Sequence, residues 1–207
     1  MFITLEGGDG SGKSVQSRRL YHCLLEEGFS ALLTHEPGGT RLGEAVTRWL
    51  KWHAETNISP ATELLLFNTS RAHLVSEVIK PALVQGKVVI CDRFDDSTLA
   101  YQGYGRGLAT EIIAEINSFA TDGLKPDLTF LLDVDPGIAL KRKFNTTADR
   151  FERETVAFHD RVRRGYLALA HAEPTRWYIL DGSRPSEELA GVILQKVRRS
   201  LSCRGAA

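Results

Sequence analysis

The stretch EGGDGSGKS, residues 6–14, most constrains the fold of this 207-residue chain. It follows the short apolar run MFITL, and four residues separate Gly7 from the sequence Gly12-Lys13-Ser14. Glycines let the backbone curl so that successive N–H groups point at phosphate oxygens, and a following helix adds its positive end. The lysine can reach the outer phosphates, and the hydroxyl can sit on a magnesium ion. The stretch therefore predicts a nucleotide-binding loop between a strand and a helix.

Short apolar stretches alternate with segments of helical periodicity along the rest of the chain. The expected strands lie at residues 2–6, 29–36, 86–94, 126–136 and 176–183. The expected helices lie at residues 12–28, 41–51, 59–83, 109–121, 136–144, 152–172 and 185–201. Such alternation indicates a parallel sheet covered on both faces. The predicted fold is α/β, a three-layer P-loop NTPase fold with a five-stranded parallel sheet, in a single domain over residues 1–207.

Polar and glycine-rich sequences follow each expected strand. In open parallel sheets, ligands bind beyond the carboxyl ends of the strands. The sequences at those ends are the glycine loop, HEPGGT, DRF, DVDP and DGS. A polar stretch at about 143–155 interrupts the later helices, and it is the candidate lid that would exclude water from the reaction.

Composition limits the partners of the chain. Lysine plus arginine balance aspartate plus glutamate at 26 each, so no overall field favours nucleic acid or a membrane surface. Cys23, Cys91 and Cys203 lack the spacing of a disulfide framework or a zinc site. No apolar run approaches the roughly 20 residues that span a bilayer, and the N-terminus lacks the pattern of a signal peptide. We expect a cytoplasmic protein with no nucleic-acid or membrane partner.

The loop alone leaves several nucleotide-binding classes open. Guanine-nucleotide switch proteins normally carry an NKxD element that reads the base, and the chain has none. Motor and transport ATPases are usually larger or repeated. A small chain with one phosphate loop and a late, arginine-bearing polar stretch favours a nucleoside monophosphate kinase.

The sequence resembles the thymidylate kinases over most of residues 2–155. The blocks that carry the resemblance are EGGDGSGKS, EPGGTRLGE, TELLLFNTSRAHLV, IKPAL, CDRFDDSTLAYQGYGRGL, PDLTFLLDVDP and DRFERE. The resemblance implies transfer of the γ-phosphoryl group of ATP to dTMP, with Mg²⁺, giving dTDP and ADP for dTTP biosynthesis. It also implies a homodimer.

The donor site follows from the loop and from one carboxylate. The residues expected to bind ATP are Gly7, Gly8, Asp9, Gly10, Ser11, Gly12, Lys13 and Ser14. Asp92 ends an apolar strand where a carboxylate could hold magnesium together with Ser14, although aspartate at such a position is also a common helix or turn cap.

The acceptor site is implied mainly by the resemblance. The residues expected to bind dTMP are Asp9, Glu36, Phe67, Arg71, Arg93, Ser97, Thr98, Tyr101 and Gln102. Phe67 and Arg71 lie four residues apart on one helix face, and the resemblance implies that they stack on the thymine and donate to a base carbonyl. Without the resemblance, Phe67 in LLLF would be assigned to the core. Tyr101 is expected to crowd a ribose 2′-hydroxyl.

The resemblance also implies the catalytic groups, which are Lys13, Arg93, Arg150 and Asp9. The guanidinium of Arg93 suits the acceptor phosphate. Gly10 occupies the position where some family members place a catalytic arginine. Charge that develops on the transferred group still needs a cation, which points to Arg150 in the DRFE motif, with Arg153 as the reserve candidate.

The chain departs from the family pattern in the region expected to clamp the acceptor phosphate. His35 stands where many members have arginine, and Thr47 stands at another common arginine position. Arg48 is one residue later, about 100° around a helix, so it cannot simply inherit the role. Arg41 is a further candidate for that role.

Two other functions stay open at this stage. One is a uridylate or cytidylate kinase, and the other is a catalytically silent nucleotide-binding protein.

Overall fold

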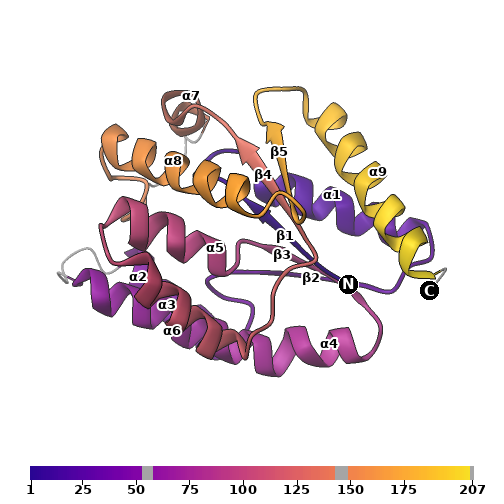
Figure 1. Cartoon of the computed structure of the whole chain (residues 1–207), viewed down its shortest axis with the longest axis horizontal. Coiled ribbons are helices and arrows are strands. Elements are labelled where there is room, and N and C mark those ends of the chain that lie inside the picture. The colour runs from indigo at the N-terminus through magenta and orange to yellow at the C-terminus, as the bar shows by residue number, and fades with distance from the viewer. Residues whose placement is uncertain (53–57, 143–148, 206–207) are drawn as a thin grey trace.

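A parallel sheet of five strands forms the centre of the molecule, with the order β2-β3-β1-β4-β5 (Figure 1). The computed structural model describes residues 1–52, 58–142 and 149–205. The strands are β1 (Phe2–Glu6), β2 (Ala31–His35), β3 (Val88–Asp92), β4 (Leu128–Asp133) and β5 (Trp177–Asp181). Every neighbouring pair is parallel, which confirms the predicted five-stranded α/β sheet.

Helices cover both faces of the sheet, as predicted. They are α1 (Lys13–Glu26), α2 (Arg41–Trp52), α3 (Pro60–Leu74), α4 (Lys80–Val84), α5 (Asp95–Thr98), α6 (Thr110–Thr121), α7 (Pro136–Lys141), α8 (Val156–Ala172) and α9 (Ser186–Gly205). In Figure 1, α1 and α9 lie on one side of the sheet, while α3, α4 and α6 lie on the other. This arrangement confirms the three-layer architecture.

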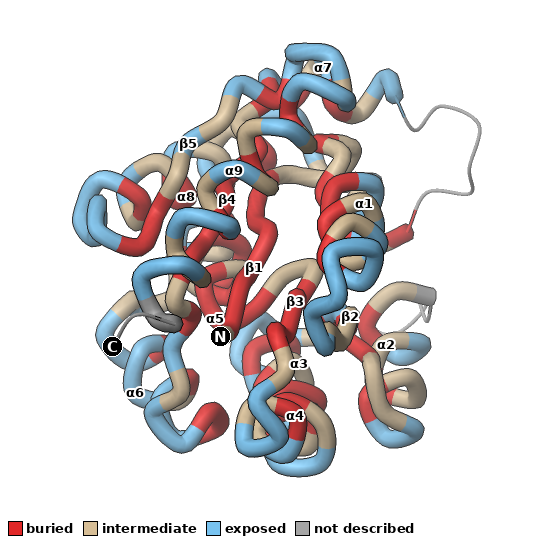
Figure 2. The backbone as a smooth tube through the Cα atoms, turned by 90° about the vertical axis from the view of Figure 1, so that its right-hand side faces the viewer, coloured by how far each residue is buried: buried red, intermediate tan, exposed pale blue. Residues whose placement is uncertain are grey.

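Side chains of alternate strand residues enter different cores, because successive side chains of a strand point to opposite faces. Ile3, Leu5 and Ile90 pack with residues of α1 and α9 in one cluster. Phe2 and Val89 pack instead against the helices of the opposite face. In Figure 2, β1, β3 and β4 are largely red, whereas pale blue marks the outer surfaces of the helices. Both sheet faces are therefore covered, and the carboxyl-end loops are left to form the site.

The single helix expected over residues 59–83 has three parts. Ser59 caps α3 by accepting a hydrogen bond from the Thr62 N–H at 3.1 Å. A π-helical turn, η1 (Val75–Ile79), then joins α3 to α4. The cap agrees with the sequence expectation, whereas the helical periodicity carries no signal for the wider turn.

The segment after the DRF sequence contains elements that the sequence analysis did not predict. α5 is followed at once by a second π-helical segment, η2 (Leu99–Gly105). η2 packs closely on α8, and a Cβ on Gly105 would lie 2.7 Å from Phe158 Cε2. The wider turn of a π-helix often occurs at functional sites, and here it carries Tyr101 and Gln102.

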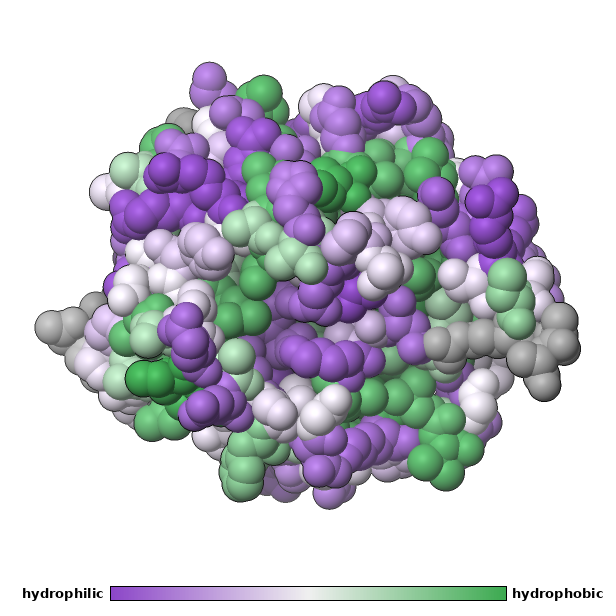
Figure 3. Space-filling view, in the orientation of Figure 1, coloured by the Kyte–Doolittle hydropathy of each residue, from purple (hydrophilic) through white to green (hydrophobic). Residues whose placement is uncertain are grey.

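Within the described residues, no helix is both long enough and apolar enough to cross a bilayer. On the face seen in Figure 3, hydrophilic and hydrophobic residues are interspersed.

We expect Ile90→Ala to lower the free energy of unfolding by about 2–5 kcal/mol, because the fully buried side chain would leave a cavity between β3 and α1. Denaturant unfolding measures the change. Val84→Ala is the matched control, since this side chain is 88% exposed and its loss should change stability by less than about 0.5 kcal/mol. Equal effects of the two substitutions would contradict the packing described here.

Candidate active site

The loop between β1 and α1 has a backbone shape that requires glycine. Gly7, Gly10 and Gly12 have φ angles of 140°, 77° and 98°. A Cβ on Gly7 would lie 2.6 Å from the Leu132 carbonyl oxygen, and one on Gly10 would lie 2.0 Å from that of Ala139. The loop therefore curls tightly against β4 and α7, and α1 begins immediately after it with its N-terminal N–H groups at the loop.

Lys13 is the buried cation of this loop. Its Nζ donates to the Gly8 carbonyl at 2.7 Å and to Ser11 Oγ at 3.3 Å. Burial, followed by repulsion from Arg93, lowers the pKa of Lys13 to about 7. Lys13 lines a cleft of about 630 Å³ together with Gly10, Gly12 and other loop residues. An anionic phosphate in this cleft would supply the opposite charge that the buried ammonium group needs.

Ser14 and Asp92 come together where β3 ends. The Ser14 hydroxyl donates a hydrogen bond to the Asp92 carboxylate, and both residues line the cleft. A hydroxyl beside a carboxylate is the oxygen donor set that Mg²⁺ accepts when it also keeps waters and substrate phosphates. Among the described residues, no group of three or more His, Cys, Asp or Glu side chains could hold a metal by itself. The pair thus fits a magnesium ion that is shared with a nucleotide.

Arg93 connects the end of β3 to the glycine loop. Its backbone has a φ of 71°, in the left-handed region that few non-glycine residues adopt. Its guanidinium donates to Asp9 Oδ1 at 2.8 Å, to the Gly7 carbonyl at 2.9 Å and to the Tyr166 hydroxyl at 2.9 Å. Tyr101 donates to the second oxygen of Asp9 at 2.7 Å. The predicted catalytic residues Asp9 and Arg93 therefore form one cluster.

Glu6 supports this cluster, and the sequence analysis missed it. The buried carboxyl group accepts hydrogen bonds from the Phe94 N–H at 2.7 Å, from Ser97 Oγ at 2.7 Å and from the Tyr166 hydroxyl at 3.1 Å. Burial, with repulsion from Asp96, raises the pKa of Glu6 to about 8. The one sequence signal was an acidic residue at the end of an otherwise apolar strand. Tyr166 in α8 gave no signal.

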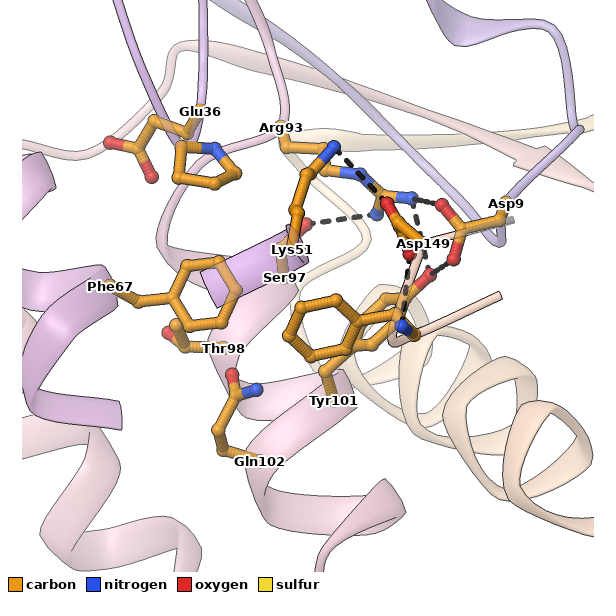
Figure 4. A pocket seen from close by; sticks show the side chains of 12 residues that line it. Asp9, Glu36, Lys51, Phe67, Arg93, Ser97, Thr98, Tyr101, Gln102 and Asp149 are labelled. Carbon is orange, nitrogen blue, oxygen red and sulfur yellow. Dashed lines mark hydrogen bonds and ion pairs between the residues drawn. The ribbon is translucent and has the colours of Figure 1, made fainter. Parts of the chain in front are cut away.

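A second pocket (Figure 4) shares lining residues with the cleft. Its lining residues are Asp9, Glu36, Pro37, Lys51, Phe67, Arg93, Ser97, Thr98, Tyr101, Gln102, Asp149 and Phe151. The sequence analysis named eight of these as acceptor-binding residues: Asp9, Glu36, Phe67, Arg93, Ser97, Thr98, Tyr101 and Gln102. It did not name Pro37, Lys51, Asp149 or Phe151.

Three aromatic rings, those of Phe67, Tyr101 and Phe151, line this pocket. The ring centroids of Phe67 and Phe151 are 5.7 Å apart in a tilted arrangement, and those of Tyr101 and Phe151 are 6.1 Å apart, edge to face. Gln102, which also lines the pocket, donates to Glu63 Oε1 at 2.6 Å. The arrangement offers apolar faces to a flat ring and polar groups at the edge of that ring.

Arg71 lies behind the pocket wall instead of lining it. Its side chain is 1% exposed, and it donates to Glu36 at 2.8 Å, to Asn117 at 2.9 Å and to Thr98 at 3.2 Å. Burial raises the pKa of Glu36 to about 7, although Arg71 opposes the change. Among the described residues, the buried Glu36 Oε1 has no hydrogen-bond partner. Donation from Arg71 to a base carbonyl stays a prediction.

Arg150 lies outside both cavities. Its Nε donates to the Leu50 carbonyl at 3.0 Å, and its Nη2 lies 2.7 Å from Glu63 Oε2. The reserve candidate Arg153 is exposed. Residues 143–148 of the predicted lid lie outside the described residues. The catalytic role of Arg150 stays a prediction, because the guanidinium would have to exchange Glu63 for a phosphate.

The departures from the family pattern have different positions in the structure. His35 Nε2 lies 3.1 Å from Glu44 Oε1, at the edge of the cleft. Thr47 also lines the cleft. Arg41 and Arg48 are exposed on α2, and neither is among the residues that line the two cavities.

A family model described as thymidylate kinase matches residues 5–193. The chain belongs to the thymidylate kinase family. It is 54% identical to a thymidylate kinase of Dehalococcoides mccartyi, strain BAV1, over 99% of this chain and 98% of the relative. It is 48% identical to that of Deinococcus radiodurans, over 93% and 94%.

A solved structure supports the same relation. The crystal structure of thymidylate kinase from Ehrlichia chaffeensis covers 97% of this chain with a TM-score of 0.76 and 37% identity, and 98% of that structure is matched. The family resemblance and the P-loop fold proposed from the sequence are therefore confirmed.

We expect Glu6→Gln to change how stability depends on pH. A carboxyl group whose pKa is raised to about 8 keeps its proton in the fold and loses it on unfolding. Between pH 4.5 and about 8, rising pH therefore favours the unfolded wild type, by up to about 1.4 kcal/mol per pH unit. The glutamine variant has no such proton to lose, so its stability relative to wild type should increase over this window. Denaturant unfolding from pH 5 to 8 measures both proteins, and parallel curves would contradict the assignment.

Proposed function

We propose that this chain is a thymidylate kinase that transfers the γ-phosphoryl group of ATP to dTMP, giving dTDP and ADP. The observation that carries the proposal is the wall between the two cavities. Five residues line both the phosphate cleft and the aromatic pocket: Asp9, Glu36, Pro37, Lys51 and Arg93. Two nucleotides bound in these cavities would meet end to end at that wall, which is the arrangement that direct phosphoryl transfer needs.

The donor phosphates belong at the glycine loop. The loop N–H groups, the start of α1 and the Lys13 ammonium group supply positive charge to the β- and γ-phosphates. Ser14 and Asp92 would hold the magnesium ion, which neutralises phosphate charge when it is bound. Such catalysis consists of positioning and charge neutralisation, so it requires no covalent enzyme intermediate.

The acceptor belongs in the aromatic pocket. Phe67 offers a face on which thymine can stack, and Gln102 lines the same pocket. Tyr101 is held by Asp9 and Arg93, so its ring is fixed, and we assign the sugar to the space beside it. A fixed ring at this position would crowd a ribose 2′-hydroxyl and favour deoxyribose. Arg93 directs its guanidinium to the shared wall, where the acceptor phosphate would lie.

Three further features belong to the proposal through family membership. They are a homodimer, a cytoplasmic location and a single kinase domain over residues 1–207 with a lid at about 143–155.

A panel of acceptors tests the function. With MgATP, coupled ADP-release turnover should be highest with dTMP, lower with dUMP, and lower again with UMP and CMP. Lys13→Ala should reduce turnover with dTMP by about 10³-fold, since the loop then lacks its buried cation. This loss would also show that the measured activity does not come from a contaminating kinase.

Each alternative predicts a different panel result. A preference for UMP or CMP would replace the proposal with a uridylate or cytidylate kinase and would refute the argument from Tyr101. ATP binding without ADP release on any acceptor would identify a catalytically silent nucleotide-binding protein.

Arg150→Ala should reduce kcat by about 10³-fold with little change in KM for dTMP, because we assign this cation to the transferring phosphoryl group. The matched control is Arg153→Ala, which removes an exposed arginine from the same motif. Steady-state kinetics with dTMP and MgATP measures both variants. A large loss in the Arg153 variant and near-normal turnover in the Arg150 variant would exchange their roles.

A further inference from the structure

Two cations stand on the wall that the two cavities share. Of the five described residues that line both cavities, Lys51 and Arg93 carry positive charge, while Asp9 and Glu36 carry carboxyl groups. A phosphate monoester with two negative charges would meet both acidic groups and the donor phosphates at this wall. Besides Arg93, the wall therefore needs a cation that can turn toward the ligand.

Both terminal nitrogens of Arg93 already donate hydrogen bonds to other groups of the protein. Nη1 donates to Gly7, Ser97 and Tyr166, and Nη2 donates to Asp9 and Tyr101. These bonds fix the position of the guanidinium, and Asp9 neutralises much of its charge. One immobilised guanidinium is thus a modest counter-charge for an incoming dianion.

Lys51 is held far more loosely. Its Nζ lies 3.5 Å from Asp149 Oδ2, beyond the 2.7–3.2 Å of an ordinary N–H···O hydrogen bond, and the side chain is 36% exposed. Asp149 does not depend on this pair, because its Oδ1 accepts from the Phe151 N–H at 2.9 Å and from the Glu152 N–H at 3.1 Å. Figure 4 shows the lysine at the pocket beside Arg93, joined to Asp149 by a dashed line. The ammonium group can exchange this partner for a phosphate at little cost.

Helix geometry explains why Lys51 reaches the site and the arginines of α2 do not. Lys51 lies four residues after Thr47, so both occupy one helix face, and both line the cleft. A helical side chain leans toward the N-terminus and covers the turn before its own Cα. This tendency places the lysine so that it can reach back toward the uncharged Thr47, whereas Arg41 and Arg48 are exposed and line neither cavity.

We propose that Lys51 binds the phosphate of the acceptor nucleotide and forms, with Arg93, a two-cation clamp at the shared wall. This inference rests on the proposed function, because it assigns the acceptor to the aromatic pocket. Lys51 supplies the charge that Thr47 lacks on the same helix face. The interaction is an ion pair with the acceptor phosphate, and no covalent bond forms or breaks in it.

The test compares a nucleotide with the same molecule lacking the phosphate. Isothermal titration calorimetry measures dTMP and thymidine binding to the wild type and to Lys51→Met. We expect the variant to bind dTMP about 10- to 100-fold more weakly, as for the loss of a charge-assisted hydrogen bond, and to bind thymidine as the wild type does. In steady-state kinetics, KM for dTMP should rise while KM for ATP stays unchanged.

Two further variants separate charge from structure. Arg48→Met is the matched control, since it removes a cation from the same helix outside both cavities, and it should leave both affinities unchanged. Thr47→Arg in the Lys51→Met background should restore part of the dTMP affinity, because it returns a cation to the same helix face.

Three outcomes would overturn the role of Lys51. They are unchanged dTMP affinity in Lys51→Met, an equal loss for dTMP and thymidine, and a rise in KM for ATP alone. Failure of the proposed function is a separate result. If the wild type prefers another monophosphate, the same comparison is made with that monophosphate and its nucleoside, and it still decides the role of Lys51.

Discussion

The ion pair between Arg93 and Asp9 is the constraint on which the rest of the site depends. It joins the end of β3 to the glycine loop, and Tyr101 and Tyr166 complete the hydrogen bonds around it. A buried guanidinium is tolerable only when its charge and its donors are satisfied. Meeting that condition fixes the loop, the π-helical segment η2 and helix α8 relative to one another. The geometry of both cavities follows from this network.

A second buried pair, Arg71 and Glu36, supports the same shared wall from behind. Arg71 and Glu36 are both almost fully buried, and their 2.7 Å contact lies directly behind the pocket. Removal of either partner would leave the other charge buried without compensation. The chain as a whole is neutral, with 26 basic and 26 acidic side chains, so this site depends on the local placement of charge. Attraction for two anionic nucleotides arises at one rim of the sheet and not from a long-range field.

The sequence predicted the strands and the longer helices more fully than it predicted the elements and side chains that hold the site together. The five strands and the Ser59 cap appeared where periodicity and capping chemistry placed them. Phe67, Tyr101 and Gln102 line one pocket, and the sequence analysis could name them for it only through the family resemblance. α5 and η2 were missed, since no simple periodicity marks a short helix that continues into a π-helical segment. Lys51 was missed because a lysine near the end of a polar helix is normally assigned to a solvated surface.

The sequence by itself determined the phosphate loop, the alternation of strands and helices, and the family, because each depends on residues that are near one another in the chain or on an ordered series of motifs. Only the tertiary structure decided which distant side chains meet. Glu6 and Tyr166 are 160 positions apart, yet their oxygens lie 3.1 Å from each other. The position of Arg71 behind the wall, and of Lys51 on the wall, likewise depends on how α2 and α3 pack beside the sheet. Helical periodicity defines a face of a helix, but packing decides what that face meets.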